Sequence, residues 1–154
     1  QAGYENVDVH VGDGSLGLPE HGPYDAIVVA AAAPAMPESL YAELRERGIS
    51  HELKVLSANR DPRGVAEYAS TAQLRGVRVV IAGAGMAAAL PGVVAAYSDL
   101  PVIGVPLRSS KSVGDGLDAL LAIAQMPPGV PVAAVGVDNA RNAAVLAARI
   151  LGIA

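Results

Sequence analysis

The sequence predicts an α/β protein built on a three-layer, doubly wound parallel sheet with an extra strand near the amino terminus. Two observations predict this class. Short apolar or β-branched runs recur along the chain. Stretches with helical spacing separate them, which is the pattern of parallel strands joined by crossover helices. A length of 154 residues suits one compact domain, so we expect a single domain over residues 1–154.

The apolar runs define the expected sheet. We expect strands near residues 7–11, 25–31, 52–56, 78–82, 101–105 and 131–137. The strand at 25–31 should be central and parallel to the strands at 52–56 and 78–82. The strand at 7–11 should add to the sheet edge beyond 52–56.

The stretches between the strands carry residues typical of helix ends. Residues Met36–Arg47 are expected to form a helix that the next glycine ends. Asp61 and Pro62 fit the N-cap and first position of a helix that ends at Gly76. An Ala-rich last helix is expected over Asn139–Leu151. Two stripes with i, i+3, i+4, i+7 spacing should face the core. They are Val65, Tyr68, Ala69 and Ala72, and Leu117, Leu120, Leu121 and Ala124.

Composition excludes several classes of function. A formal charge of -4 with only 11 Lys and Arg gives no basic stripe for a nucleic-acid backbone. Without cysteine there is no disulfide framework and no thiolate metal site, and no long uncharged apolar run predicts a membrane span. The chain begins at Gln1 with no signal-like segment, so we expect a fragment of cytoplasmic type.

From about residue 48 onward, a series of motifs stands in a recognisable order. They are Ser-Ala-Asn-Arg-Asp-Pro at 57–62, Ala-Gly-Ala-Gly-Met-Ala-Ala-Ala-Leu-Pro-Gly at 82–92, Leu-Pro-Val-Ile-Gly-Val-Pro at 100–106, Gly-Leu-Asp-Ala-Leu-Leu at 116–121, and Gln-Met-Pro and Gly-Val-Pro-Val within 125–132. This series resembles the PurE family of carboxyaminoimidazole ribonucleotide mutases. The resemblance implies a flavodoxin-like fold, and an enzyme ancestor that moves a carboxylate on an aminoimidazole ribonucleotide without a metal or an organic cofactor.

The resemblance also shows which chemical groups are missing. The family's general acid/base is the histidine of its Ser-Ala-His-Arg loop, and the matching residue here is Asn59, which has no titratable proton near neutral pH. The second family histidine corresponds to Ala89. The family's Gly-Ser-x-Ser-Asp loop falls on residues 31–35, where no Ser or Asp stands. We therefore expect no catalytic residues of that family in this chain.

Some residues at family binding positions persist. Ser57 and Arg60 match positions that contact the phosphate, and an arginine beside a hydroxyl at a strand end can bind an anion; the alternative is that Arg60 only caps or solvates a helix start.

The glycine-rich segment is the second candidate for ligand binding. Gly83, Ala84 and Gly85 belong to a segment, 83–88, that can form a turn whose backbone amides favour an anion, or a turn needed only for packing. Asp118 has a partner role in the family but more simply faces solvent. A phosphate or ribonucleotide is thus the expected ligand.

Residues 1–40 carry different motifs, among them Val-Gly-Asp-Gly-Ser-Leu-Gly at 11–17 and Pro-Tyr-Asp-Ala-Ile-Val-Val at 23–29. This segment resembles protein-L-isoaspartate O-methyltransferases, whose Gly-Asp-Gly turn lies at the S-adenosylmethionine site. The upstream glycine-rich loop of that site does not precede it here, so Asp13 is expected only to shape a turn. His10 and His21 are expected to be exposed, not a metal pair. We interpret the chain as an engineered chimera of 1–40 with 41–154, joined within residues 36–47.

Three functions remain open at this point. The first is an inactive PurE-like scaffold, and the second is a surviving enzyme of related chemistry. The third is a dinucleotide-binding module, because residues 83–88 fit the loose Gly-x-Gly-x-x-Ala pattern after a strand. The third lacks the expected acidic residue after the next strand. Family members assemble as octamers, so a homo-oligomer is possible for this chain.

Overall fold

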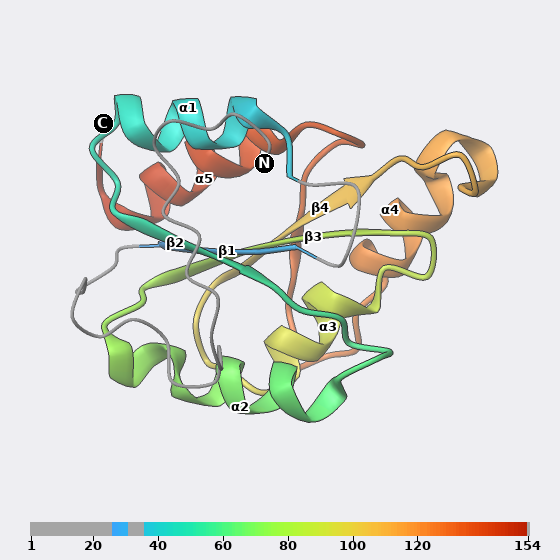
Figure 1. Ribbon diagram of the computed structural model, residues 1–154, viewed down its shortest axis with the longest axis horizontal. Helices are drawn as coiled ribbons and strands as arrows, with labels where there is room; N and C mark the ends of the chain where they lie inside the picture. The colour runs from blue at the N-terminus through green and yellow to red at the C-terminus, as the bar shows by residue number, and fades with distance from the viewer. Residues whose placement is uncertain (1–25, 31–35, 154) are drawn as a thin grey trace.

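The computed structural model describes residues 26–30 and 36–153, the former as backbone only (Figure 1). The strands are β1 (Ala26–Ala30), β2 (His51–Val55), β3 (Val79–Gly85), β4 (Val102–Leu107) and β5 (Ala133–Ala134). The helices are α1 (Glu38–Glu46), α2 (Pro62–Ala72), α3 (Ala89–Ala96), α4 (Leu117–Ala124) and α5 (Ala140–Leu151), with short 3₁₀ turns η3 (Gln73–Arg75) and η4 (Val113–Gly116).

The sheet is parallel throughout, with strand order β2-β1-β3-β4-β5. β1 pairs with both β2 and β3, so Val28 lies between Leu53 and Ile81 in the register. The prediction that the strand at 25–31 is parallel to both neighbours is therefore confirmed. The predicted strand at 7–11 lies outside the described residues.

Helices cover both faces of the sheet, which gives three layers (Figure 1). α1 and α5 lie together on one face, and α2 and α3 lie on the other. Each face has its own apolar core. Ile81, Ile103 and Val105 pack with α1 and α5, whereas Val80 and Ala82 pack with α2, α3 and α4. This alternation along each strand is what a sheet buried on both sides requires.

Helix-end chemistry behaves as the sequence predicts. The Asp61 carboxylate accepts a hydrogen bond from the Gly64 backbone N–H at 3.0 Å, which caps α2, and Pro62 begins the helix. After η3 the chain leaves through Gly76, whose φ of 87° lies in the left-handed region that glycine adopts without steric cost. Asn139 caps α5 in the same manner as Asp61 caps α2.

The predicted apolar stripe of α4 is wrong, whereas that of α2 is confirmed. All four stripe residues of α2 are buried. In α4 the buried residues are instead Ala119 and Ile123, while Leu117 is 50% exposed and Leu121 is 47% exposed. Leu120 is half-buried and Ala124 is exposed. Ala119 and Ile123 are buried in place of the leucines, so the i, i+3, i+4, i+7 spacing indicated the wrong face of this short helix.

The strand predicted at 131–137 is also shorter in the structure. Only Ala133–Ala134 pairs with β4, although the Val135 N–H still donates to the Gly104 carbonyl at 3.1 Å. Pro131, just before the strand, has no N–H to donate. Conversely, β3 runs to Gly85, three residues beyond the predicted end, because its last residues pair with Pro106 and Leu107.

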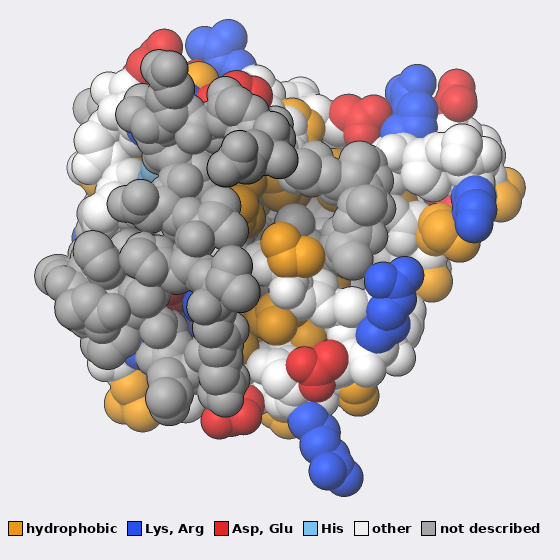
Figure 2. Space-filling view, viewed as in Figure 1, with side chains coloured by type: hydrophobic (Ala, Val, Ile, Leu, Met, Phe, Trp, Pro, Cys, Tyr) orange, Lys and Arg blue, Asp and Glu red, His pale blue; other side chains and the backbone are white. Residues whose placement is uncertain are grey.

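The surface of the described residues carries charges of both signs. On the face shown in Figure 2, acidic and basic side chains are interspersed, and hydrophobic side chains are visible at the end that carries α4. Two leucines of α4 are exposed, Leu117 and Leu121. Within the described part of the chain, no helix has the length and apolar character needed to cross a membrane.

Candidate functional site

The carboxyl ends of the parallel strands meet at one edge of the sheet. Because the chain leaves β1 toward β2 on one side and returns to β3 on the other, the connections diverge between β1 and β3. In open α/β sheets such a divergence marks the crevice in which ligands bind. The loop after β2 and the carboxyl end of β3 flank the end of β1 at this edge, and both contain predicted site residues.

The loop after β2 is a tight turn that leads into α2. The N–H groups of Arg60 and Asp61 both donate to the Ser57 carbonyl, at 3.2 and 2.8 Å. Ser57 is half-buried, while Asn59 and Arg60 are exposed. The helix cap is supplied by Asp61, so Arg60 is not the capping residue; its side chain extends from the start of α2 into solvent.

The glycine-rich segment after β3 differs from the predicted turn over 83–88. Gly83, Ala84 and Gly85 are still strand residues, paired with Val105, Pro106 and Leu107. The turn itself is shorter: it comprises Met86 and Ala87 and is closed by the Ala88 N–H, which donates to the Gly85 carbonyl at 3.0 Å. Any anion at this turn therefore meets residues 86–88, not the glycines.

Backbone strain is concentrated at this edge of the sheet. Among the described residues, those other than glycine with positive φ are Met86 (57°), Ala88 (39°), Asp115 (57°) and Asp138 (57°). All of them follow the carboxyl end of a strand: β3, β4 or β5. Such residues cluster at functional sites, where surrounding structure holds them in a conformation they do not favour. Sequence reasoning missed this feature, although the methionine in a glycine-rich turn was a visible signal.

Two aspartates stabilise the loop that follows β4. The Asp138 carboxylate accepts a hydrogen bond from the Arg108 N–H at 2.8 Å and lies 3.5 Å from its guanidinium Nε. Asp118, at the start of α4, accepts from the N–H groups of Val113 and Ala119, at 3.0 and 2.9 Å. The expectation that Asp118 simply faces solvent is thus wrong: it is half-buried and fixes this loop.

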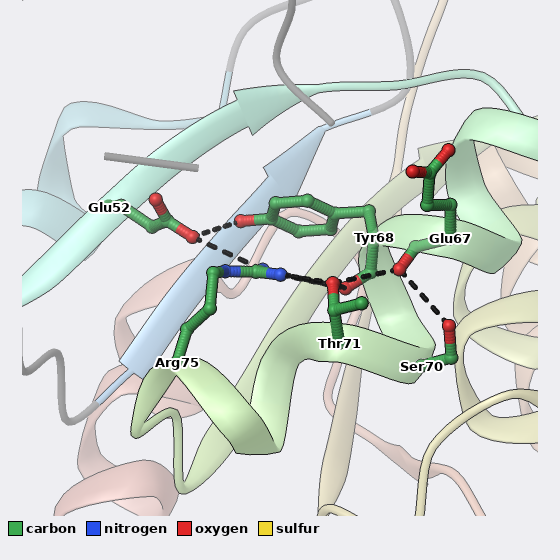
Figure 3. A network of polar contacts seen from close by, with 6 residues as sticks. All are labelled: Glu52, Glu67, Tyr68, Ser70, Thr71 and Arg75. Atoms are coloured by element: carbon green, nitrogen blue, oxygen red, sulfur yellow. Dashed lines mark hydrogen bonds and ion pairs between the residues drawn. The ribbon is translucent and has the colours of Figure 1, made fainter. Parts of the chain in front are cut away.

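A buried polar network holds α2 against β2 (Figure 3). The Tyr68 hydroxyl donates to Glu52 Oε1 at 2.5 Å, and Arg75 Nη2 lies 3.6 Å from the same oxygen. The Arg75 guanidinium also stacks 4.5 Å from the Tyr68 ring centre and donates to Thr71 Oγ1. Burial, reinforced by the Glu52 charge, raises the pKa of the Tyr68 hydroxyl well above its usual range. Glu52 lies near the amino end of β2, so this network is away from the loop 57–61, which follows the carboxyl end of that strand.

His51, the histidine within the described residues, lies away from the carboxyl ends of the strands. His51 is the first residue of β2, where its Nδ1 lies 3.0 Å from the Ile49 carbonyl and its ring stacks on Tyr41. His10 and His21 lie outside the described residues. Within residues 26–30 and 36–153 no cluster of His, Cys, Asp and Glu is suited to hold a metal ion.

Comparison with known proteins identifies the family. The model of the AIR carboxylase family matches residues 27–154. The chain belongs to the AIR carboxylase family. A model of protein-L-isoaspartate(D-aspartate) O-methyltransferase matches residues 1–51. The two matches overlap within 27–51, which includes the predicted join at 36–47; an engineered origin for that join stays a prediction.

Relatives in the AIR carboxylase family are similar in sequence and in fold. An N5-carboxyaminoimidazole ribonucleotide mutase of Pyrococcus abyssi is 54% identical over 120 residues, or 78% of this chain and 67% of the relative. The mutase of Thermotoga maritima is 56% identical over 110 residues, or 71% and 63%. The crystal structure of Treponema denticola PurE has a TM-score of 0.71 at 27% identity, covering 82% of this chain and 79% of that chain. Its fold is flavodoxin-like, as predicted. This chain spans roughly two thirds of the length of the two mutases.

Proposed function

We propose that this chain is an AIR carboxylase-family scaffold with little or no mutase turnover, which retains at most the binding of a phosphate or a ribonucleotide at its strand ends. The observation that carries the proposal is Asn59. It stands in the loop after β2, where the resemblance to PurE proteins puts the histidine that acts as general acid/base.

The chemistry explains why this one residue weighs so heavily. Movement of a carboxylate onto an imidazole carbon requires that this carbon lose its proton and that the atom giving up the carboxylate gain one. An amide side chain neither accepts nor releases a proton near neutral pH, and loss of a positioned acid/base lowers the rate by roughly 10² to 10⁴. Ala89, at the first position of α3, supplies only a methyl group where the second histidine is expected. Among the described residues the only histidine is His51, at the opposite end of β2.

The direct test is an assay for interconversion of the two carboxylated aminoimidazole ribonucleotides. We expect no turnover above background from the unaltered chain. Asn59→His alone should stay near background. Activity should return when Ala89→His and a Gly-Ser-x-Ser-Asp loop across residues 31–35 are added. Robust turnover by the unaltered protein would contradict the proposal and favour the alternative of an active mutase or lyase that uses other groups.

Residual anion binding is supported by Ser57 and Arg60. Both belong to the turn at the end of β2, and the exposed guanidinium of Arg60 can make charge-assisted hydrogen bonds to a phosphate. Titration calorimetry with inorganic phosphate tests this role. Arg60→Met should abolish the binding heat. Arg63→Met, which removes another exposed arginine three residues along the chain, within α2, should leave it unchanged. Equal loss in both variants would indicate only a general effect of charge.

A further inference from the structure

An open groove lies between the last strand of the described sheet and α5. Its volume is about 400 Å³, within the range of clefts that bind ligands. Ala134 and Val135 line it at the end of β5, and four residues line it from α5: Asn142, Val145, Leu146 and Arg149. The spacing of these four is i, i+3, i+4, i+7, so they share one face of the helix. This face is distinct from the alanine-rich face of α5 that packs on the sheet.

The main chain of Ala134 is turned toward the groove. Val135 packs against the core shared with α5, and its N–H donates to the Gly104 carbonyl of β4 at 3.1 Å. Successive residues of a strand direct their side chains to opposite faces and their main-chain groups to opposite sides. The Ala134 side chain therefore points away from α5, and its N–H and C=O point away from β4. Because β5 is the last strand of the described sheet, these two groups lie at an edge to which an extended chain can pair.

The side chains of the groove define the chemistry of an occupant. Val145 and Leu146 are half-buried and give it an apolar surface. Arg149 is exposed, and no described carboxylate forms an ion pair with it. No acidic side chain is among the described residues that line the groove. An unpaired guanidinium favours a ligand that carries a carboxylate, and the main-chain groups of Ala134 favour one with amide groups in an extended conformation.

We propose that the groove between β5 and α5 binds an extended acidic peptide, whose main chain pairs with Ala134 along the edge of β5 and whose carboxylate contacts Arg149. The two features together select a peptide over a small carboxylate, which would use Arg149 alone and leave the edge of β5 unpaired. None of the residues that line the groove belongs to the loop proposed to bind phosphate, so this inference does not depend on that function.

Three peptides and one small anion separate the parts of this contact. The first peptide is acetyl-Thr-Val-Glu-Val-Thr-amide, and the second has lysine in place of glutamate. The third is the glutamate peptide with both valine nitrogens methylated, which removes two of the N–H donors needed to pair with a strand. Sodium acetate is the small anion. Each probe is titrated into the full chain labelled with ¹⁵N, and the amide signals of the groove residues and of the loops at the strand ends are followed.

We expect the glutamate peptide to shift the signals of the groove residues and to bind at least about tenfold more tightly than either the lysine peptide or the methylated peptide. Acetate should leave the Ala134 signal unchanged. Arg149→Glu should reverse the preference, so that the lysine peptide binds more tightly. Arg63→Glu is the matched control, because it changes the net charge equally at an exposed arginine of α2, and it should bind as the unaltered chain does. Thermal unfolding checks that each variant is folded.

Several results would overturn the inference. They are no binding of the glutamate peptide, shifts at the strand-end loops instead of the groove, and equal binding of the lysine or the methylated peptide. Acetate shifts at Ala134 as large as those from the peptide would indicate a small-anion site and would also overturn it, as would equal changes in Arg63→Glu and Arg149→Glu. If Arg149→Glu does not fold, the preferences of the unaltered chain among the four probes decide the question.

Discussion

The loops at the carboxyl ends of the strands and the packed faces of the sheet follow different rules. On the faces, α2 and α5 begin at capping side chains, and alanine- and valine-rich stripes of the helices pack against the strands. In the loops, residues such as Met86 and Asp138 adopt positive φ. At the two positions where the resemblance to PurE proteins implies histidines, the chain has Asn59 and Ala89. The fold is thus specified by regions that do not contain the site, so the site can lose its chemistry while the fold is retained.

The largest effect should come from the network between β2 and α2. Arg75→Met would leave the Glu52 carboxylate, whose side chain is 5% exposed, without its cation, and such a loss typically costs about 3–5 kcal/mol. Glu52 Oε2 and Arg75 Nε already have no hydrogen-bond partner among the described residues, so little is available to compensate. Urea unfolding measures the change.

The matched control for this variant is Arg63→Met on the exposed side of α2, which should change the free energy of unfolding by no more than about 0.5 kcal/mol. Similar losses in both variants would show that the Glu52 network contributes no more to the free energy of unfolding than an exposed arginine does. The distinction between the packed faces and the loops would then fail.

Close packing of β4 gives the next effect. A Cβ on Gly104 would overlap Ile123 Cγ2 and lie 3.1 Å from Val132 Cγ1, so Gly104→Ala should destabilise by about 1–3 kcal/mol. Gly92→Ala is the control, since its Cβ would meet only the flexible end of Met126 at 3.1 Å and alanine is the better helix former in α3. Thermal unfolding should rank Gly92→Ala as neutral or stabilising, and the reverse order would contradict the packing argument.

Helix capping contributes less. Asp61→Ala should cost about 1 kcal/mol, because the Gly64 N–H loses its acceptor at the start of α2. Asp61→Asn keeps an oxygen at the same place and should recover most of that loss. Chemical denaturation of the two variants tests this, and equal destabilisation by both would assign the effect to charge instead of to the cap.

Sequence reasoning predicts the faces of this molecule better than its site, and particular residues show why. Asp61, Pro62 and Gly76 act on backbone groups within a few residues of themselves, so the ends of that helix can be recognised locally. The face of α4 depends instead on how closely the helix approaches β4, which its own spacing does not reveal.

The strand-end site depends on non-local features to a greater degree. The last residues of β3 pair with Pro106 and Leu107. The first part of the segment predicted as a glycine-rich turn is therefore strand. The resemblance to PurE proteins located Asn59 and Ala89 by position, but it gave no indication that Met86, three residues before Ala89, is exposed and has a positive φ.

The smallest effect is expected from the pH dependence of Glu43, a buried carboxylate that joins α1 to α5. Its Oε1 accepts from Arg47 Nε at 2.8 Å and its Oε2 accepts from Arg141 Nε at 2.7 Å. The hydrogen bond from Arg141, followed by that from Arg47, lowers the pKa of Glu43 in the folded protein. A lowered folded-state pKa means that the contribution to stability is fully present above the unfolded-state value, about 4.3 for glutamate, and is lost as the pH falls toward the folded-state pKa.

Glu43→Gln should therefore flatten the fall in stability below that pH, whereas Glu67→Gln, which changes an exposed glutamate of α2, should leave the slope unchanged. Because Arg141 is largely exposed, water and salt screen the pair, and the flattening should shrink as ionic strength rises. Unfolding by urea at a series of pH values, at low and high salt, measures both trends; an unchanged slope in Glu43→Gln would mean that the two arginines do not stabilise the charged carboxylate.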